Sequence, residues 1–225
     1  MSLPLVLVHG WGFGAGMWRP LRRGLTTQTV QVLDLGFYGR PQLEFPPDRN
    51  FIAIGHSLGF LWLTRQLQTQ PDLSSRCLGL IAVNGFCRFA RAEDFPAGVP
   101  RRILERMSVR LLSDPEGVLH DFLRQGGIEQ PLALPSGVDI PALQQGLVWL
   151  TDWDSRALFV DWHKPLQVIA SLDDRVVTPE MTRSQFDAMP ADCQCWLPDG
   201  GHLLPMTRPG FLASQIHAFV DVCVA

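Results

Sequence analysis

The sequence predicts an α/β fold, with a mostly parallel sheet of about six strands, helices on both faces and an inserted helical segment. Short apolar runs alternate with helix-like segments along the chain, as expected when parallel strands are joined by crossover helices. Residues 87–164 break this pattern, because they contain several prolines and helical stretches but no convincing strand. We therefore expect a core formed by residues 1–86 and 165–225, with residues 87–164 inserted as a helical lid.

Six apolar runs are the expected strands. The first, residues 5–8, is apolar throughout, which is typical of a strand that is covered on both faces. The others are residues 30–35, 51–54, 77–83, 166–171 and 193–197. Helices are expected at 17–25, 58–68 and 211–222, but not at 41–50, which is short and has two adjacent prolines.

Composition limits the classes of function. Hydrophobic residues make up 46% of the 225 residues, enough for a buried core, and the net charge of −3 gives no basic field for nucleic acid or anionic lipid. Five cysteines without zinc or disulfide spacing indicate reduced thiols. The first residues lack the features of a signal peptide, and no apolar run approaches about 18 residues. We expect a cytoplasmic protein with no nucleic-acid or membrane partner.

A serine lies at the predicted junction of a strand and a helix. Residues 55–59 read Gly-His-Ser-Leu-Gly, between the apolar run 51–54 and the helical segment that starts at Leu58. Glycines on both sides allow the tight turn that exposes a nucleophilic hydroxyl, and the following helix directs its first N–H groups toward developing negative charge. Ser57 is therefore the candidate nucleophile.

The base and the acid are expected later in the chain. His202 follows two glycines after the last predicted strand, and an imidazole there can lie over Ser57. His56 is next to the serine but is expected to point away across the turn. Asp174 is preferred over Asp173 as the carboxylate that orients His202, which leaves Asp173 as a solvated loop carboxylate or a helix cap.

The developing oxyanion needs two converging N–H donors. Leu58 supplies one from the start of the helix, and Trp11 supplies the other from the His-Gly-Trp-Gly loop at residues 9–12. The Trp11 indole is also a candidate wall of the acyl pocket. The chain order Ser57, Asp174, His202 is that of α/β-hydrolases.

Residues 9–12, 55–59, 174–177 and 201–202 together resemble the α/β-hydrolase superfamily across essentially the whole chain. More narrowly, the sequence resembles the pimeloyl-acyl-carrier-protein methyl ester esterases of biotin synthesis, at residues 6–12 with Trp18, 89–96 and 122–125. This resemblance implies substrate contacts by Phe122 and Gln125 and an acyl carrier protein as a possible partner.

The sequence also departs from that family. The chain begins almost at its first strand, so we expect the family's two N-terminal strands to be missing. The crossover after Arg40 is shortened, and His56 stands where the family commonly has tryptophan.

A basic stripe marks the predicted lid. Arg102, Arg106 and Arg110 fall on one side of a helix at residues 101–112, opposite Ile103, Met107 and Leu111. The stripe is a candidate docking surface for an acidic carrier protein. The alternative is a solvated face, with the arginines paired to Glu105, Glu116 or Asp121.

The combined prediction is a serine carboxylesterase that needs no metal or organic cofactor. The expected substrate is the methyl ester of a dicarboxylic acyl chain on acyl carrier protein. Three alternatives stay open: a general short-chain esterase or thioesterase, a carbon–carbon bond hydrolase of the same fold, and a non-catalytic binding module.

Overall fold

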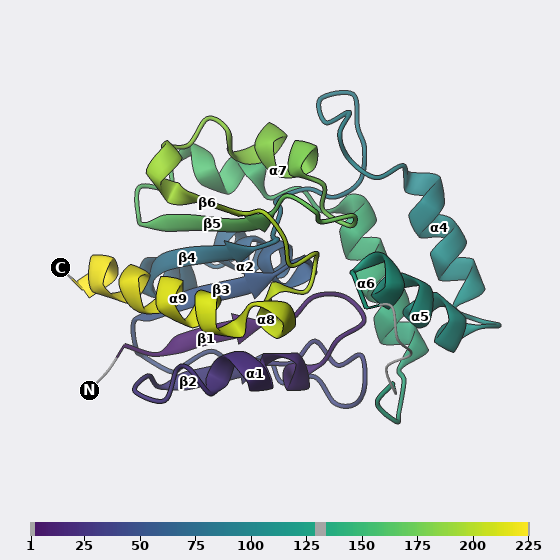
Figure 1. Ribbon diagram of the computed structural model, residues 1–225, viewed down its shortest axis with the longest axis horizontal. Helices are drawn as coiled ribbons and strands as arrows, with labels where there is room; N and C mark the ends of the chain where they lie inside the picture. Colours follow the sequence, from purple (N-terminus) through teal and green to yellow (C-terminus); the bar gives the residue numbers. More distant parts are fainter. Residues whose placement is uncertain (1–2, 129–133, 225) are drawn as a thin grey trace.

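The computed structural model describes residues 3–128 and 134–224 and places a parallel sheet at the centre of the molecule (Figure 1). Its described part has six strands in the order β2-β1-β3-β4-β5-β6, and every neighbouring pair is parallel. The strands are β1 (Leu5–Val8), β2 (Val30–Leu33), β3 (Phe51–His56), β4 (Cys77–Val83), β5 (Leu166–Ser171) and β6 (Gln194–Leu197). The predicted fold class is confirmed.

Helices cover both faces of this sheet. They are α1 (Arg19–Arg22), α2 (Leu58–Thr69), α3 (Pro71–Arg76), α4 (Arg101–Arg110), α5 (Pro115–Gln125), α6 (Ile140–Asp152), α7 (Pro179–Phe186), α8 (Leu204–Thr207) and α9 (Pro209–Val224). Three 3₁₀ turns lie at Ala15–Trp18, Arg156–Val160 and Ala191–Cys193.

Alternate residues of each strand point to opposite faces, which divides the core in two. Leu5 and Leu7 of β1 pack with residues of α1 and α9, including Leu21 and Ile216. Val6 and Val8 lie on the other side and pack with α2. Strands that are buried on both faces explain the unbroken apolar runs in the sequence.

Two connections depart from simple crossover helices. The helix expected at 17–25 is replaced by a 3₁₀ turn and the single turn of α1. Pro20 has no N–H and fits only the first helical turn, so the α-helix starts at Arg19. The link between β2 and β3, described throughout, contains no helix, as its prolines predicted.

Helices α4, α5 and α6 lie between β4 and β5 in the chain and are grouped beyond one end of the sheet (Figure 1). Helix α4 packs along α6. Leu104, Leu119 and Leu147 from these helices join the same buried cluster as Trp11 and Leu58. The inserted helices therefore share a core with the loops that follow β1 and β3. Within the described ranges, no helix is long and apolar enough to cross a membrane.

Candidate active site

Ser57 occupies a strained turn between β3 and α2. Its backbone has φ 54° and ψ −125°, outside the favoured regions for a residue with a side chain. Both flanking glycines are needed for packing. A Cβ on Gly55 would lie 2.3 Å from the Phe60 Cα, and one on Gly59 would lie 2.2 Å from the Val8 carbonyl oxygen. Helix α2 can approach the strand ends this closely only with glycine at both positions.

Three side chains from separate loops form a continuous hydrogen-bonded chain. His202 Nε2 lies 3.0 Å from Ser57 Oγ, and His202 Nδ1 lies 2.8 Å from Asp174 Oδ2. The three residues follow β3, β5 and β6, and all are buried. An imidazole between a hydroxyl and a carboxylate is the arrangement that activates a serine nucleophile.

The two neighbouring aspartates have different partners. Asp174 Oδ1 accepts the N–H groups of Val176 and Val177 at 2.7 and 2.9 Å, which leaves Oδ2 for His202. The Asp173 carboxylate accepts the Ser171 hydroxyl and the Gly201 N–H. Asp173 is exposed, as expected for a solvated loop carboxylate, and it also connects the end of β5 to the loop of His202.

His56 does not point away from the site, contrary to the expectation. Its ring lies 4.8 Å from that of His202, and its Nε2 lies 2.8 Å from the His202 carbonyl oxygen. A carbonyl only accepts, so Nε2 carries the proton. The other nitrogen, Nδ1, is buried without a hydrogen-bond partner among the described residues and faces Gly10, where a Cβ would lie 2.7 Å away. Burial and the adjacent His202 hold the pKa of His56 well below its ordinary value, which keeps this imidazole neutral.

The loop of residues 9–12 is fixed from several sides. The buried Trp11 donates its indole N–H to the Leu143 carbonyl of α6 at 2.8 Å. His9 Nε2 accepts the Leu35 N–H at 3.0 Å. A Cβ on Gly10 would lie 3.0 Å from Ser57 Cβ, so this loop passes directly beside the serine. Gly10, the residue before Trp11, therefore lies beside Ser57, and Trp11 and Leu58 stay the predicted oxyanion donors.

The three residues for which substrate contact was predicted line the same cavity. Trp11, Phe122 and Gln125 line a space of about 250 Å³ beneath the inserted helices. The Phe122 ring meets Trp11 edge-on at 5.2 Å and His202 at 6.1 Å. Most of the other lining side chains are apolar, and Arg91 and Arg175 add positive charge. Such a cavity suits an acyl chain with a polar end.

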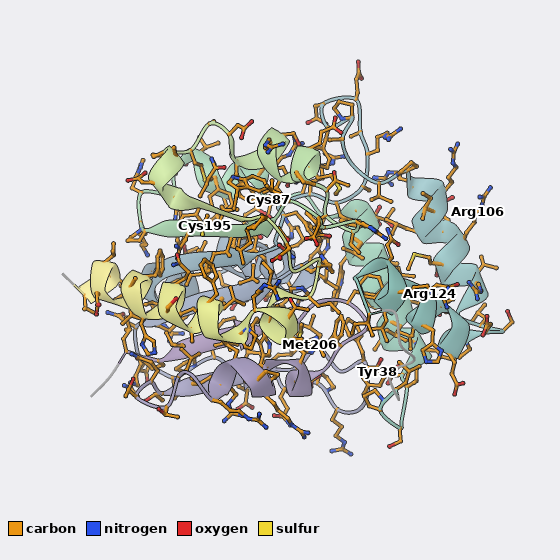
Figure 2. The ribbon with its side chains drawn as sticks, viewed as in Figure 1. Tyr38, Cys87, Arg106, Arg124, Cys195 and Met206 are labelled. Carbon is orange, nitrogen blue, oxygen red and sulfur yellow. The ribbon has the colours of Figure 1, made fainter. Side chains whose placement is uncertain are left out.

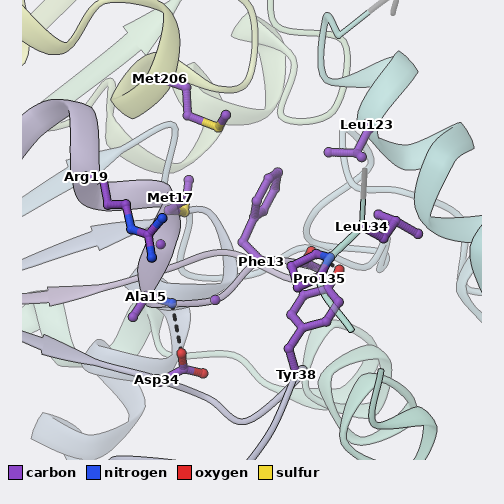
Figure 3. Close-up of a pocket in the computed structure, with 13 residues that line it drawn as sticks. Phe13, Ala15, Met17, Arg19, Asp34, Tyr38, Leu123, Leu134, Pro135 and Met206 are labelled. Carbon is purple, nitrogen blue, oxygen red and sulfur yellow. Dashed lines mark hydrogen bonds between the residues drawn. The ribbon is translucent and has the colours of Figure 1, made fainter. Parts of the chain in front are cut away.

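A second cavity, of about 520 Å³, is lined by Phe13 (Figure 3). The Phe13 ring contacts both His56 and Phe122, at 6.2 and 6.1 Å between centroids. Figure 3 shows Tyr38 in its wall. The hydroxyl of the half-buried Tyr38, whose pKa desolvation raises to about 12, donates to the Gly12 carbonyl. Sequence reasoning missed Phe13, although its place in the glycine-rich loop after β1 was a usable signal.

Asn84 is a second residue that sequence reasoning missed. It directly follows β4 and has φ 44°, a conformation that asparagine tolerates better than most residues. Its Nδ2 donates to the Gly201 carbonyl at 2.9 Å, and its Oδ1 accepts the Ser171 N–H at 3.2 Å. Asn84 therefore fixes the loop that carries His202, and its position at a strand end was the available signal.

The three arginines of the predicted stripe on α4 are all exposed, and one of them is held by carboxylates. Arg102 and Arg106 are exposed, and Figure 2 shows Arg106 on the outer side of the helix. Arg110 is paired with Asp114 at 2.7 Å and with Asp121 at 2.6 Å. The pair with Asp121 is one that the solvated-face alternative predicted.

The apolar face of α4 is also rotated from the prediction. Leu104 and Leu111 are buried, whereas Ile103 is 42% exposed. The reason is that α4 packs on α6 through residues spaced i, i+3 and i+7, with Met107 between the two leucines.

Curated proteins that are similar in sequence include esterases and a bifunctional protein of biotin synthesis. No family model matches the chain. The sequence is 28% identical over 242 residues to the pimeloyl-[acyl-carrier protein] methyl ester esterase of Stenotrophomonas maltophilia, covering 96% of this chain and 92% of the relative. It is also 28% identical to the biotin biosynthesis bifunctional protein BioHC of Cellvibrio japonicus, covering 96% of this chain and 47% of that protein.

Solved structures show the same fold at lower identity. An esterase from Exiguobacterium antarcticum superposes with a TM-score of 0.82 at 16% identity, covering 98% of this chain and 92% of that structure. An esterase from Thermogutta terrifontis gives 0.77 at 19% identity, covering 99% and 91%. The resemblance to α/β-hydrolases and to pimeloyl-acyl-carrier-protein methyl ester esterases is confirmed, and so is the predicted class of carboxylic ester hydrolase.

Proposed function

We propose that this carboxylic ester hydrolase uses Ser57 as nucleophile, His202 as general base and Asp174 as the orienting acid. The observation that carries the proposal is the buried chain from Ser57 Oγ through His202 to Asp174 Oδ2, with links of 3.0 and 2.8 Å. Its order along the sequence and its position at the carboxyl ends of the strands support the same assignment.

The proposed reaction follows from the order of these three groups in the hydrogen-bonded chain. Ser57 Oγ attacks the ester carbonyl carbon while His202 Nε2 takes the hydroxyl proton, and Asp174 stabilises the imidazolium. The backbone N–H groups of Trp11 and Leu58 are the proposed donors to the oxyanion. Collapse of the intermediate breaks the ester C–O bond, and His202 protonates the departing alkoxide. Water, deprotonated by His202, then attacks the acyl carbon; the bond to Ser57 Oγ breaks, the acid leaves, and His202 returns the proton to Ser57 Oγ.

For the substrate, we propose the methyl ester of a pimeloyl chain carried on acyl carrier protein, in biotin synthesis. The similarity to esterases named for that substrate supports this choice. The cavity lined by Trp11, Phe122 and Gln125 is mostly apolar and suits an extended acyl chain. We propose that residues 87–164 act as a lid over it, with 1–86 and 165–225 as the core.

The outer face of α4 is the proposed contact for the carrier protein. Arg102 and Arg106 are exposed there, beside Val109 and Leu112, which are 70% and 67% exposed. Positive charge with apolar side chains suits a partner that is acidic and partly apolar. We retain Arg110 at the edge of this surface, although its pairing with Asp114 and Asp121 reduces its availability.

The test is rescue of biotin-free growth in a bacterial strain that lacks its own pimeloyl-ester esterase. We expect rescue by the wild-type chain and none by Ser57→Ala expressed at the same level. Labelling of the purified chain with a fluorophosphonate, absent in Ser57→Ala, tests the nucleophile separately. Labelling without rescue would contradict the proposed substrate and favour a general short-chain esterase.

A further inference from the structure

The carboxyl end of α5 contacts both loops that carry the proposed acid and base. Gln125 Nε2 donates to the carbonyl oxygen of Arg175, the residue after Asp174, at 2.9 Å. The carbonyl of the next residue, Gly126, accepts the His202 N–H at 3.3 Å. A single turn of an inserted helix thus touches the two loops whose alignment decides whether His202 can act as a base.

The close approach of α5 depends on glycine in the His202 loop. Gly201 has φ +63°, and a Cβ there would lie 3.0 Å from the Gly126 carbonyl oxygen. The same loop is bound on its other side by the core, since His56 donates to the His202 carbonyl and Asn84 donates to the Gly201 carbonyl. The loop is therefore held between the core and α5.

The loop of Asp174 is held from two sides as well. Asp174 Oδ1 accepts the N–H groups of Val176 and Val177, so residues 174–177 form a tight turn around the carboxylate. The carbonyl of Arg175, inside this turn, receives its side-chain hydrogen bond from Gln125. A change in the orientation of the Arg175 peptide would therefore also change the orientation of the Asp174 carboxylate.

We infer that Gln125 is a positioning residue, which acts on the reaction by holding the Asp174 turn in line with His202. The inference rests on the proposed function, because it gives Gln125 a role in the reaction of Ser57. It goes beyond the substrate contact that the family resemblance implies for Gln125. Small displacements of catalytic groups are costly, since stabilisation of the imidazolium depends on a fixed geometry.

The test replaces the amide donor without changing the length of the side chain. Gln125 is exposed, so Gln125→Met is expected to fold normally. Gln144→Met is the matched control, because Gln144 Nε2 donates to the Ser108 carbonyl at 3.0 Å within the inserted helices and contacts neither loop. Both variants are assayed with p-nitrophenyl acetate and with a small fluorophosphonate, whose reaction with Ser57 needs the base but not the acyl cavity.

We expect Gln125→Met to lower kcat and the rate of phosphonylation by about 10-fold each, while KM changes by less than about twofold. Gln144→Met should match the wild type in every measurement. A rise in KM with unchanged kcat and phosphonylation would overturn the inference and leave Gln125 as a substrate contact.

Two further results would also count against the inference. Equal losses in Gln125→Met and Gln144→Met would show that the effect comes from general loosening of the inserted helices. Failure of the wild type to react with fluorophosphonate at Ser57 would overturn the proposed function and the inference with it. If the wild type reacts normally and Gln125→Met has the same kcat and phosphonylation rate, only the inference about Gln125 is contradicted.

Discussion

The strained backbone at Ser57 exposes its hydroxyl. We therefore expect that this hydroxyl can be removed without loss of the fold. Ser57→Ala keeps the backbone conformation and the packing of Gly55 and Gly59 against α2 and β1. We expect it to lower kcat by about 10⁶-fold with nearly unchanged Tm. Turnover of p-nitrophenyl esters by the purified variant, compared with wild type, is the measurement. Appreciable residual turnover would refute the nucleophile assignment.

The two aspartates after β5 offer a paired test of the acid. Asp174→Asn should reduce kcat by about 10⁴-fold, because an amide at Oδ2 favours the wrong tautomer of His202. Asp173→Asn should cost little, since an asparagine oxygen can still accept the Gly201 N–H that Asp173 binds now. Steady-state kinetics of both variants decide the assignment, and the reverse order of effects would assign the acid role to Asp173.

Burial of His56 makes stability depend on pH. The pKa of His56 in the folded chain lies below its unfolded value of about 6.5, so the unfolded state binds the proton more tightly. The free energy of unfolding is therefore unaffected by this group above about pH 6.5. It decreases as the pH falls below that value, by up to about 1.4 kcal/mol per pH unit. His56→Gln keeps a donor for the His202 carbonyl and removes the titration. Urea unfolding between pH 7 and 5 should show a shallower pH dependence for the variant, and parallel curves would contradict it.

At the scale of residues, the sequence predicted what depends on local context. Ser57, Asp174 and His202 were predicted to meet because each follows a recognisable strand, and such loops meet at one edge of a parallel sheet; the structure places the three side chains within hydrogen-bond distance. The orientation of His56 was mispredicted, because it is set by Phe13 and Gly10, which reach it from a distant part of the chain.

Helix α4 gives the prediction that belongs to a single element. Reversing Arg102 and Arg106 to glutamate should raise KM for carrier-bound ester and leave hydrolysis of a small free ester near wild type. Exposed charges act over a Debye length of about 8 Å at physiological ionic strength, so the wild-type preference for the carrier-bound ester should fade in high salt. Kinetics on both substrates at low and high salt provide the measurement.

Arg110 is the internal control for this surface. Its pairs with Asp114 and Asp121 connect α4 to the start and middle of α5. Arg110→Glu should lower Tm modestly, because it places a third negative charge beside Asp114 and Asp121, whereas the reversal of Arg102 and Arg106 should not. Equal KM values for wild type and the double variant on carrier-bound ester at low salt would favour a solvated face.

At the scale of elements, apolar periodicity predicted the strands better than the helices. β4 and β5 were predicted with the bounds that they have, because strands buried on both faces are continuous apolar runs. The helix expected at 17–25 is shorter, and α4 is rotated. Its buried face depends on where α6 lies, which residues 101–112 do not encode.

The whole molecule depends on how the inserted helices are fastened to the core. Four charged residues tie the two ends of the insertion together: Arg88 and Asp94 near its start, and Asp154 and Arg156 near its end. Asp154 accepts from Arg88 at 2.7 Å and from Arg156 at 2.6 Å, with only 31% of its side chain exposed. The sequence showed an insertion of this size, but pairing of its ends is a long-range contact without a local pattern.

The charged cluster leads to a prediction about local opening of the inserted helices. Asp154→Asn removes a charge and leaves two partly buried arginines with weaker partners, which should cost about 1–3 kcal/mol of stability. Asp152→Asn is the matched control, because its pair with Arg101 is exposed, at 56% and 48%, and such pairs contribute little. We expect Asp154→Asn to speed amide hydrogen exchange in α4, α5 and α6 while β1, β3 and β4 stay protected, since local opening precedes global unfolding where stability is lowest. Asp152→Asn should exchange like the wild type. If the two variants exchange alike, the cluster does not fasten the insertion, and the shared apolar core around Leu104 and Leu147 holds it instead.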